Sequence, residues 1–238
     1  MSSRSDNYVL RFTLSERIQH FLLLGSLLVL ALTGLSLMFH DTALGRFMIR
    51  LEGGLESRGM IHRISAAVLI VVSLYHHAYV LLSERGHLLL RNYLFHRDDL
   101  RRAAQGLKYN LGSGDAAADW GKFNLAQKLQ YFGVIFGVCS MILTGLVLWV
   151  GTPAIALIPK WLMDLTIIIH GHEGFLIFII LLLWHLYNVH LAPGNFPMNM
   201  SWITGRIPIE ECKMRYPAEH KRLLETGELR ESIPSGGK

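Results

Sequence analysis

Histidines at the ends of apolar segments are the residues of this sequence best placed to do chemistry. The chain has 12 histidines among 238 residues. Five of them lie at or near the ends of long apolar stretches: His20, His62, His76, His170 and His185. An ionisable group within reach of lipid is costly, so it usually faces the inside of a helix bundle and marks a functional site. Haem iron takes axial imidazoles, two of them in a low-spin electron carrier, so we expect two haems stacked across a membrane.

Four apolar segments are long enough to carry these histidines across a bilayer. A hydrocarbon core about 30 Å thick needs about 20 apolar residues per helix, and the sequence predicts such helices at about 18–39, 61–82, 129–151 and 165–191. Hydrophobic residues make up 51% of the chain and charged residues 17%, a composition more apolar than that of a soluble domain. The predicted fold is an all-α integral membrane protein. It is a four-transmembrane-helix bundle binding haem b in residues 1–200, followed by a cytoplasmic C-terminal tail, 201–238.

Positive charge gathers in the segments that flank the predicted helices. The net charge is +5, and the lysines and arginines concentrate in the amino-terminal segment, in the loop at about 83–130 and in the tail. The positive-inside rule then places both termini of a multi-pass membrane protein in the cytoplasm. We expect the membrane to be the bacterial cytoplasmic (inner) membrane. Because helix flanks account for the charge, we expect the lipid bilayer as a partner and no nucleic acid.

Cysteine usage restricts the kind of haem. Cys139 and Cys212 are the two cysteines of the chain, and no CxxCH sequence is present. Covalent attachment of haem and an iron–sulfur cluster are therefore excluded, and any haem must be held non-covalently.

Helical spacing sorts the histidines into two layers. His62 and His76 are 14 residues apart, about 40° short of four turns with about 21 Å of rise. His170 and His185 are 15 apart, about 60° beyond four turns with about 22 Å of rise. Depth pairs His62 with His170 at an outer haem. The inner haem has His185, and its second ligand is either His20 or His76.

Two arginines adjoin predicted ligands. Arg17 lies three residues before His20, and Arg63 directly follows His62. We expect both to pair with haem propionates, although an ordinary charged helix flank explains them equally well.

Several short motifs occur in an order typical of one family. They are LSERIQHF at 14–21, LTGL at 32–35, RGMIH at 58–62, KFNLAQK at 122–128, Thr144-Gly145, Trp149, Ile169-His170 and the HLY of 185–187. Over about residues 10–200 the chain resembles the formate dehydrogenase gamma-subunit family, a group of respiratory cytochromes b that bind two haems and react with quinone. The resemblance implies that His20 and His185 hold the inner haem, and that quinone or menaquinone binds beside it. It points to Asn124 as a hydrogen-bond partner of a quinone carbonyl, with Gln127 and Lys128 as weaker candidates.

The chain departs from that pattern at three histidines and one spacing. His76, His77 and His190 are additional, and the ligands of the fourth helix are 15 apart where the family leads us to expect 14. Similar histidine-rich second helices occur in relatives that serve multihaem c-type cytochromes. A third haem held by His76 and His190 is therefore an alternative to a quinone-handling or proton-handling role for these residues.

The sequence as a whole predicts the membrane-anchor cytochrome b subunit of a respiratory oxidoreductase. It would carry electrons between an external iron–sulfur or multihaem c subunit and the quinone pool, and we expect no residue that catalyses a reaction of a soluble substrate. One alternative is a tri-haem variant that oxidises quinol for a multihaem c-type cytochrome. Another is a histidine-lined transition-metal transporter, which would place its ligands near the bilayer midplane, where 66–73 and 175–183 carry none.

Overall fold

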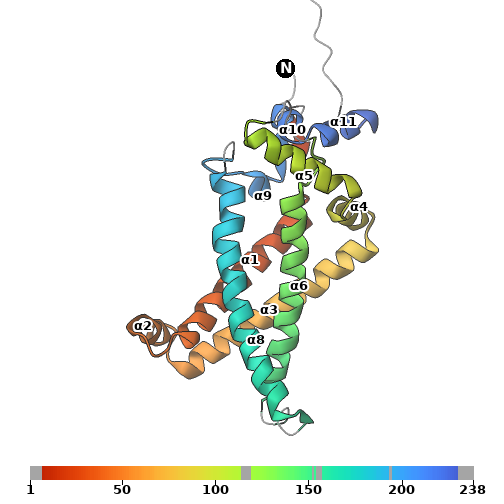
Figure 1. Ribbon diagram of the computed structural model, residues 1–238. Helices are drawn as coiled ribbons and strands as arrows, with labels where there is room; N and C mark the ends of the chain where they lie inside the picture. Colours follow the sequence, from red (N-terminus) through yellow and green to blue (C-terminus); the bar gives the residue numbers. More distant parts are fainter. Residues whose placement is uncertain (1–6, 114–118, 152, 154–156, 193–194, 230–238) are drawn as a thin grey trace, which may run out of the picture. The chain divides into compact units, whose positions relative to one another are not determined.

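Long apolar helices dominate the computed structural model, which describes residues 7–113, 119–151, 153, 157–192 and 195–229. Among these residues four helices are long and apolar enough to cross a membrane (Figure 1), with mean hydropathies of 1.8 to 2.3. They are α1 (Leu14–Met38), α3 (Leu55–Leu82), α6 (Leu125–Val150) and a last span, Lys160–Leu191, that begins with α8 (Lys160–Ile179). The predicted all-α membrane fold is confirmed.

The four spans begin earlier than the apolar pattern predicts. Helix α3 starts at Leu55 rather than about 61, and the last span starts at Lys160 rather than about 165. Backbone hydrogen bonds, unlike hydropathy, continue through polar residues, so the helices extend beyond the part that lipid would cover. The carboxyl-terminal ends, at Met38, Leu82, Val150 and Leu191, fall within one residue of the prediction.

The last span is not a regular α-helix throughout. After α8 the chain forms two π-helical segments, η1 (Ile180–His185) and η2 (Tyr187–Leu191). A π-helical bond joins residues i and i+5, so such a turn holds one residue more than an α-helical turn, and it is often found at functional sites. One extra residue taken up in η1 reduces the His170–His185 spacing from 15 to an effective 14. The directions in which His170 and His185 leave the helix axis then differ by about 40°, as they do for His62 and His76.

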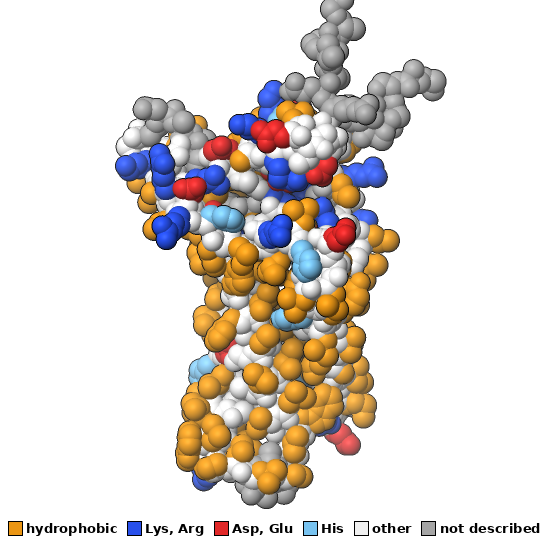
Figure 2. All heavy atoms as spheres, turned by 90° about the vertical axis from the view of Figure 1, so that its right-hand side faces the viewer, with side chains coloured by type: hydrophobic (Ala, Val, Ile, Leu, Met, Phe, Trp, Pro, Cys, Tyr) orange, Lys and Arg blue, Asp and Glu red, His pale blue; other side chains and the backbone are white. Residues whose placement is uncertain are grey.

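The described residues divide into two compact units, one of which comprises Ser15–Ser83 and Phe132–Asn199. This unit, the helical unit below, contains most of each span together with the short helix α2 (Ala43–Leu51) between α1 and α3. Large apolar side chains on its surface are exposed, including Val71 at 67% and Leu143 at 67%. Figure 2 shows such hydrophobic side chains covering the helices. An extensive apolar surface of this kind is typical of helices in contact with lipid.

The other unit, the polar unit below, joins three distant segments: Met1–Leu14, Glu84–Tyr131 and Met200–Lys238. Strands β1 (Tyr8–Leu10) and β2 (Arg206–Pro208) pair in it antiparallel. Its helices are α4 (Glu84–Tyr93), α5 (Arg97–Asn110), α9 (Ser201–Thr204), α10 (Ile209–Arg215) and α11 (Pro217–Glu225). The predicted tail thus starts close to where the polar unit resumes, at Met200, and its residues 230–238 lie outside the described part of the chain.

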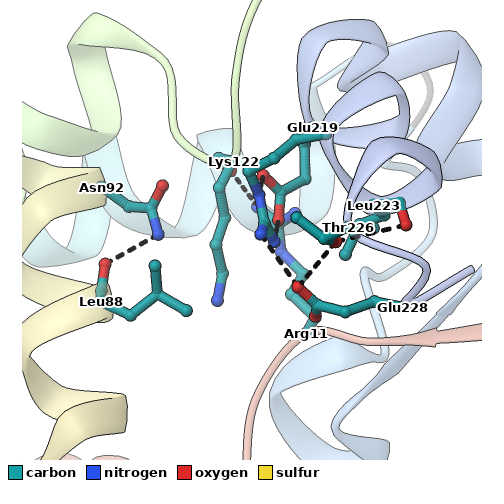
Figure 3. Close-up of polar contacts among 9 residues, drawn as sticks. Arg11, Leu88, Asn92, Lys122, Glu219, Leu223, Thr226 and Glu228 are labelled. Carbon is teal, nitrogen blue, oxygen red and sulfur yellow. Dashed lines mark hydrogen bonds and ion pairs between the residues drawn. The ribbon is translucent and has the colours of Figure 1, made fainter.

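Arg11 joins the three segments of the polar unit. It is 5% exposed, and its guanidinium carbon lies 4.0 Å from the centre of the Tyr216 ring. Its Nη2 donates a hydrogen bond of 2.9 Å to the carbonyl oxygen of Lys122 (Figure 3). The ring contact and the hydrogen bond to a carbonyl both stabilise the charge of this buried guanidinium. The tail core beside it consists of Ile207, Cys212, Tyr216 and Leu223.

Candidate functional site

His62 of α3 and His170 of α8 face each other in the helical unit. Their ring centres are 6.3 Å apart and their ring planes meet at 69°. A metal–imidazole bond is about 2.0–2.1 Å long, and the ring centre lies about 1.1 Å behind the ligating nitrogen. Two imidazoles that share one iron therefore have centres about 6.3 Å apart. The observed distance leaves room for one iron between the two rings.

A second histidine pair has nearly the same separation. The ring centres of His20, on α1, and His185, on η1, are 6.4 Å apart, with an angle of 44° between the rings. His76 is oriented differently: its Nδ1 lies 2.8 Å from the Oε1 of Gln19, and its ring packs against His77. Of the two residues that the sequence offers as partner of His185, the geometry favours His20.

The additional histidine of the last span lies near the inner pair. His190 is close enough to His185 for the two rings to interact electrostatically. A third haem held by His76 and His190 stays a prediction. Within the described ranges, no group of three or more His, Cys, Asp or Glu side chains is arranged to hold a bare metal ion. Each histidine pair offers two imidazoles, the number that a haem iron takes from the protein.

His62 and His170, the predicted outer ligands, each contact a threonine that is followed by a glycine. His62 Nδ1 lies 2.8 Å from Thr33 Oγ1, and His170 Nδ1 lies 2.9 Å from Thr144 Oγ1. Thr33 is on α1 and 2% exposed, and Thr144 is on α6. A hydrogen bond at Nδ1 leaves Nε2 of each ring for a metal, the usual arrangement at protein metal sites.

The 122–128 motif forms the start of α6, within the polar unit. The backbone N of Asn124 donates to Gln127 Oε1 at 3.0 Å, and the backbone N of Gln127 donates to Asn124 Oδ1 at 2.9 Å. This is a capping box, which satisfies two backbone donors at the helix start. These two bonds use the backbone N and the Oδ1 of Asn124, so the Nδ2 of this amide remains a donor for a ligand.

Lys128 is engaged in a buried ion pair. Its Nζ lies 2.7 Å from Asp99 Oδ2 and 3.0 Å from the carbonyl oxygen of Leu94, and the Lys128 and Asp99 side chains are 5% and 4% exposed. Burial works against ionisation of Asp99, but hydrogen bonds from Lys128 and the His96 backbone lower the pKa of this carboxyl. The ion pair gives Lys128 a structural role at the start of α6.

Aromatic and cationic side chains surround the same motif in the polar unit. Tyr93 stacks on Phe123 with ring centres 4.0 Å apart, and on Tyr131 with ring centres 3.8 Å apart. A cavity of about 390 Å³ adjoins the stack. Its lining includes Arg91, His96, Arg102, Lys122 and Phe123. Flat rings beside polar donors suit a planar ligand with carbonyl groups.

Comparison with known proteins agrees with this geometry. Residues 11–193 match the family model described as prokaryotic cytochrome b561. The chain belongs to the prokaryotic cytochrome b561 family. A curated relative, the formate dehydrogenase cytochrome b556 subunit of Haemophilus influenzae, is 22% identical over 236 residues, which cover 98% of this chain and 93% of the relative. The resemblance to the formate dehydrogenase cytochromes b is confirmed, and family membership implies haem b in a transmembrane electron-transport protein.

The arginines of this cytochrome b561 family member differ in their surroundings. Arg63 lies on α3, close enough to His62 to interact with it electrostatically. Arg58, on the same helix, also does so, although it was not predicted as a site residue. Arg58 Nη1 donates to the carbonyl oxygen of Thr33 at 2.6 Å. Its spacing of four residues from His62, one helical turn, would have identified it. Arg17 is three residues from His20 on α1, and the assignment of Arg17 and Arg63 to propionates stays a prediction.

Proposed function

We propose that this protein is the membrane-anchor cytochrome b subunit of a respiratory oxidoreductase, carrying electrons through two b haems. The two histidine pairs, with ring centres 6.3 and 6.4 Å apart, support this most directly. Each pair offers two neutral imidazoles from different helices, the ligand set of a low-spin haem that transfers electrons without binding a substrate at iron. The bound haem would supply one-electron chemistry, and the protein supplies its ligands and a dry surrounding.

The two pairs lie in separate layers of the helical unit. His170 and His185 share the last span, and an effective spacing of 14 residues corresponds to about 21 Å along the helix axis. The hydrocarbon core is about 30 Å thick, so ligands at these two depths serve opposite halves of a bilayer. An electron entering at the His62–His170 pair and leaving from the His20–His185 pair would cross most of the membrane.

We assign Asn124 as a donor to a carbonyl of quinone or menaquinone. Its Oδ1 caps α6, while its Nδ2 keeps two protons available for a ligand. The stacked rings of Tyr93, Phe123 and Tyr131 in the same unit offer apolar faces for a planar headgroup. Gln127 and Lys128 are weaker candidates, because Gln127 Oε1 accepts from the Asn124 backbone and Lys128 is paired with Asp99.

We also propose that the chain works with a partner subunit that carries the chemistry of the soluble substrate. The relative in Haemophilus influenzae is named as a subunit of formate dehydrogenase, and this chain covers 93% of it. An iron–sulfur or multihaem c subunit would supply or accept electrons at the outer pair. We also propose that both termini are cytoplasmic, which places quinone chemistry on that side.

Haem counting tests the proposal and separates it from its alternatives. The purified full chain should contain two b haems per polypeptide by pyridine haemochrome assay, with a reducible b-type spectrum. Replacing either His62 or His170 by alanine should remove one haem. His172→Ala is the matched control, because His172 is exposed on the same helix and its Nδ1 lies against the Ile168 carbonyl.

Three haems per polypeptide would favour the tri-haem variant that oxidises quinol. A chain that binds transition-metal ions but lacks haem would instead favour the transporter and overturn the proposal. Loss of haem in His172→Ala, with retention in His170→Ala, would overturn the ligand assignment.

A further inference from the structure

The outer histidines share a local arrangement that recurs on two helices. Thr33 precedes Gly34 on α1 and contacts His62, while Thr144 precedes Gly145 on α6 and contacts His170. The two Oγ1–Nδ1 distances, 2.8 and 2.9 Å, are those of ordinary hydrogen bonds. The repetition indicates that the contact serves the site rather than one helix alone.

The direction of each hydrogen bond follows from the hydroxyl's single proton. Thr33 Oγ1 donates to the carbonyl oxygen of Val29 at 2.7 Å, and Thr144 Oγ1 donates to that of Ser140 at 2.8 Å. A hydroxyl has one proton to give and two lone pairs to accept with. Each threonine therefore accepts from its histidine, which must carry its proton on Nδ1. The lone pair of Nε2 is then available to iron.

The glycines allow each ring to lie close to the helix backbone beside its threonine contact. A Cβ built on Gly145 would lie 3.0 Å from His170 Cε1, and one built on Gly34 would lie 3.8 Å from His62 Cε1. The rings thus approach the helix backbone where no side chain intervenes. Threonine and glycine together fix the orientation of the imidazole.

The inner pair lacks this arrangement at one ligand. His185 Nδ1 is buried and has no hydrogen-bond partner within the described part of the chain. Any effect of the threonine bonds should therefore act on the outer site alone, which makes the inner site an internal reference.

We propose that Thr33 and Thr144 are positioning residues that hold the outer imidazoles in the Nδ1–H form and lower the reduction potential of the haem they ligate. This inference rests on the proposed function. Accepting a hydrogen bond from Nδ1–H raises the basicity of Nε2, as at other protein metal sites. A more basic ligand stabilises ferric over ferrous iron, because the ferric ion carries the larger positive charge.

Valine replacements test the inference, because valine keeps the branched shape of threonine without the hydroxyl. Potentiometric titration of the full chain in membranes should show the outer haem shifted upward in Thr33→Val and in Thr144→Val. We expect about a tenfold change in its reduction equilibrium, which is about 59 mV for one electron. The inner haem should keep its potential. Thr33→Ser and Thr144→Ser restore the acceptor and should restore the wild-type potential.

Thr166→Val is the matched control. Thr166 is a buried threonine on α8 whose hydroxyl donates to the Leu162 carbonyl at 2.8 Å. Its replacement should move neither potential. The His170→Ala variant identifies which of the two titration steps belongs to the outer haem.

The outcomes separate this inference from the proposed function. A wild-type chain without haem would overturn the proposed function. A wild-type chain with two haems, whose potentials are unchanged in both valine variants or shift together, would overturn the inference alone. Where a valine variant loses the outer haem, the serine variant decides: retention with the wild-type potential supports the hydroxyl's role, and loss contradicts it.

Discussion

Replacing Gly145 by alanine should loosen the haem that we assign to His170 while leaving the proposed inner haem in place. The added Cβ would lie 3.0 Å from His170 Cε1, with Nδ1 and Nε2 of the same ring at 3.7 and 3.9 Å. Carbon atoms in contact normally lie about 3.5–4.0 Å apart. The ring must move by about 0.5 Å or more away from α6, which would lengthen its hydrogen bond to Thr144.

The size of the effect follows from the cost of overpacking. Forcing one additional carbon into a packed site costs about 1–3 kcal/mol. Since about 1.4 kcal/mol is a tenfold change in binding, the affinity of the outer site for haem should fall about 5-fold to 150-fold. Alanine also favours the helix by up to about 1 kcal/mol relative to glycine, so the variant should fold as well as wild type.

The assay is the transfer of haem from the purified chain to an excess of a haem-scavenging apoprotein, followed by absorbance. Gly133→Ala is the matched control, because Gly133 lies on the same helix and a Cβ there meets nothing within 4 Å. Gly34→Ala, with a contact of 3.8 Å, should retain haem nearly as well as the control. Haem release from Gly145→Ala at the rate of Gly133→Ala would refute the reasoning.

Three further predictions concern other parts of the chain. His20→Ala should lose one haem and His76→Ala none, as counted by pyridine haemochrome; a lost haem in the latter would show that His76 is a ligand. Asn124→Asp keeps the capping oxygen but removes the amide donor, so quinone-dependent oxidation of the reduced haem should slow about tenfold, the worth of one hydrogen bond, without loss of thermal stability. Lys128→Met leaves Asp99 buried and unpaired, which should lower the stability of the polar unit by about 3–5 kcal/mol. Because the pKa of Asp99 is lowered in the folded wild type, the contribution of the ion pair to wild-type stability should be fully present above the unfolded pKa of about 3.9 and should be lost as the pH falls through the folded value.

The helices and the depth of the histidines could be predicted from the sequence because both depend on local patterns. Hydropathy over about 20 residues defines a span, and a constant rise per residue gives each histidine its depth. The pairing of His62 with His170 follows from depth, and their rings do face each other. Spacing could not choose between His20 and His76, since both lie at the inner level. Packing of Gln19 against His76 is a tertiary contact that no periodicity records.

The polar unit could not be predicted from local patterns, because long-range contacts hold it together. Its three segments are far apart in the sequence, its elements are short, and contacts such as Arg11 with Tyr216 join residues more than 200 positions apart. The capping contacts of Asn124 and Gln127 could be predicted from the sequence, because a polar cap residue followed three residues later by glutamine is typical of a capping box. The ion pair of Lys128 with Asp99 depends on how α5 packs, and the sequence contains no local sign of it.

The wide turn at Ile180–His185 has a consequence for how this chain is aligned with its relatives. An inserted residue in a regular α-helix would rotate everything after it by about 100°. Here the added residue is accommodated within one turn, and His185 still meets His20. An alignment with a relative whose ligands are 14 apart therefore needs a one-residue gap inside 180–185. Without that gap, every position from His185 to Leu191 would be matched to the wrong neighbour, and its role would be transferred incorrectly.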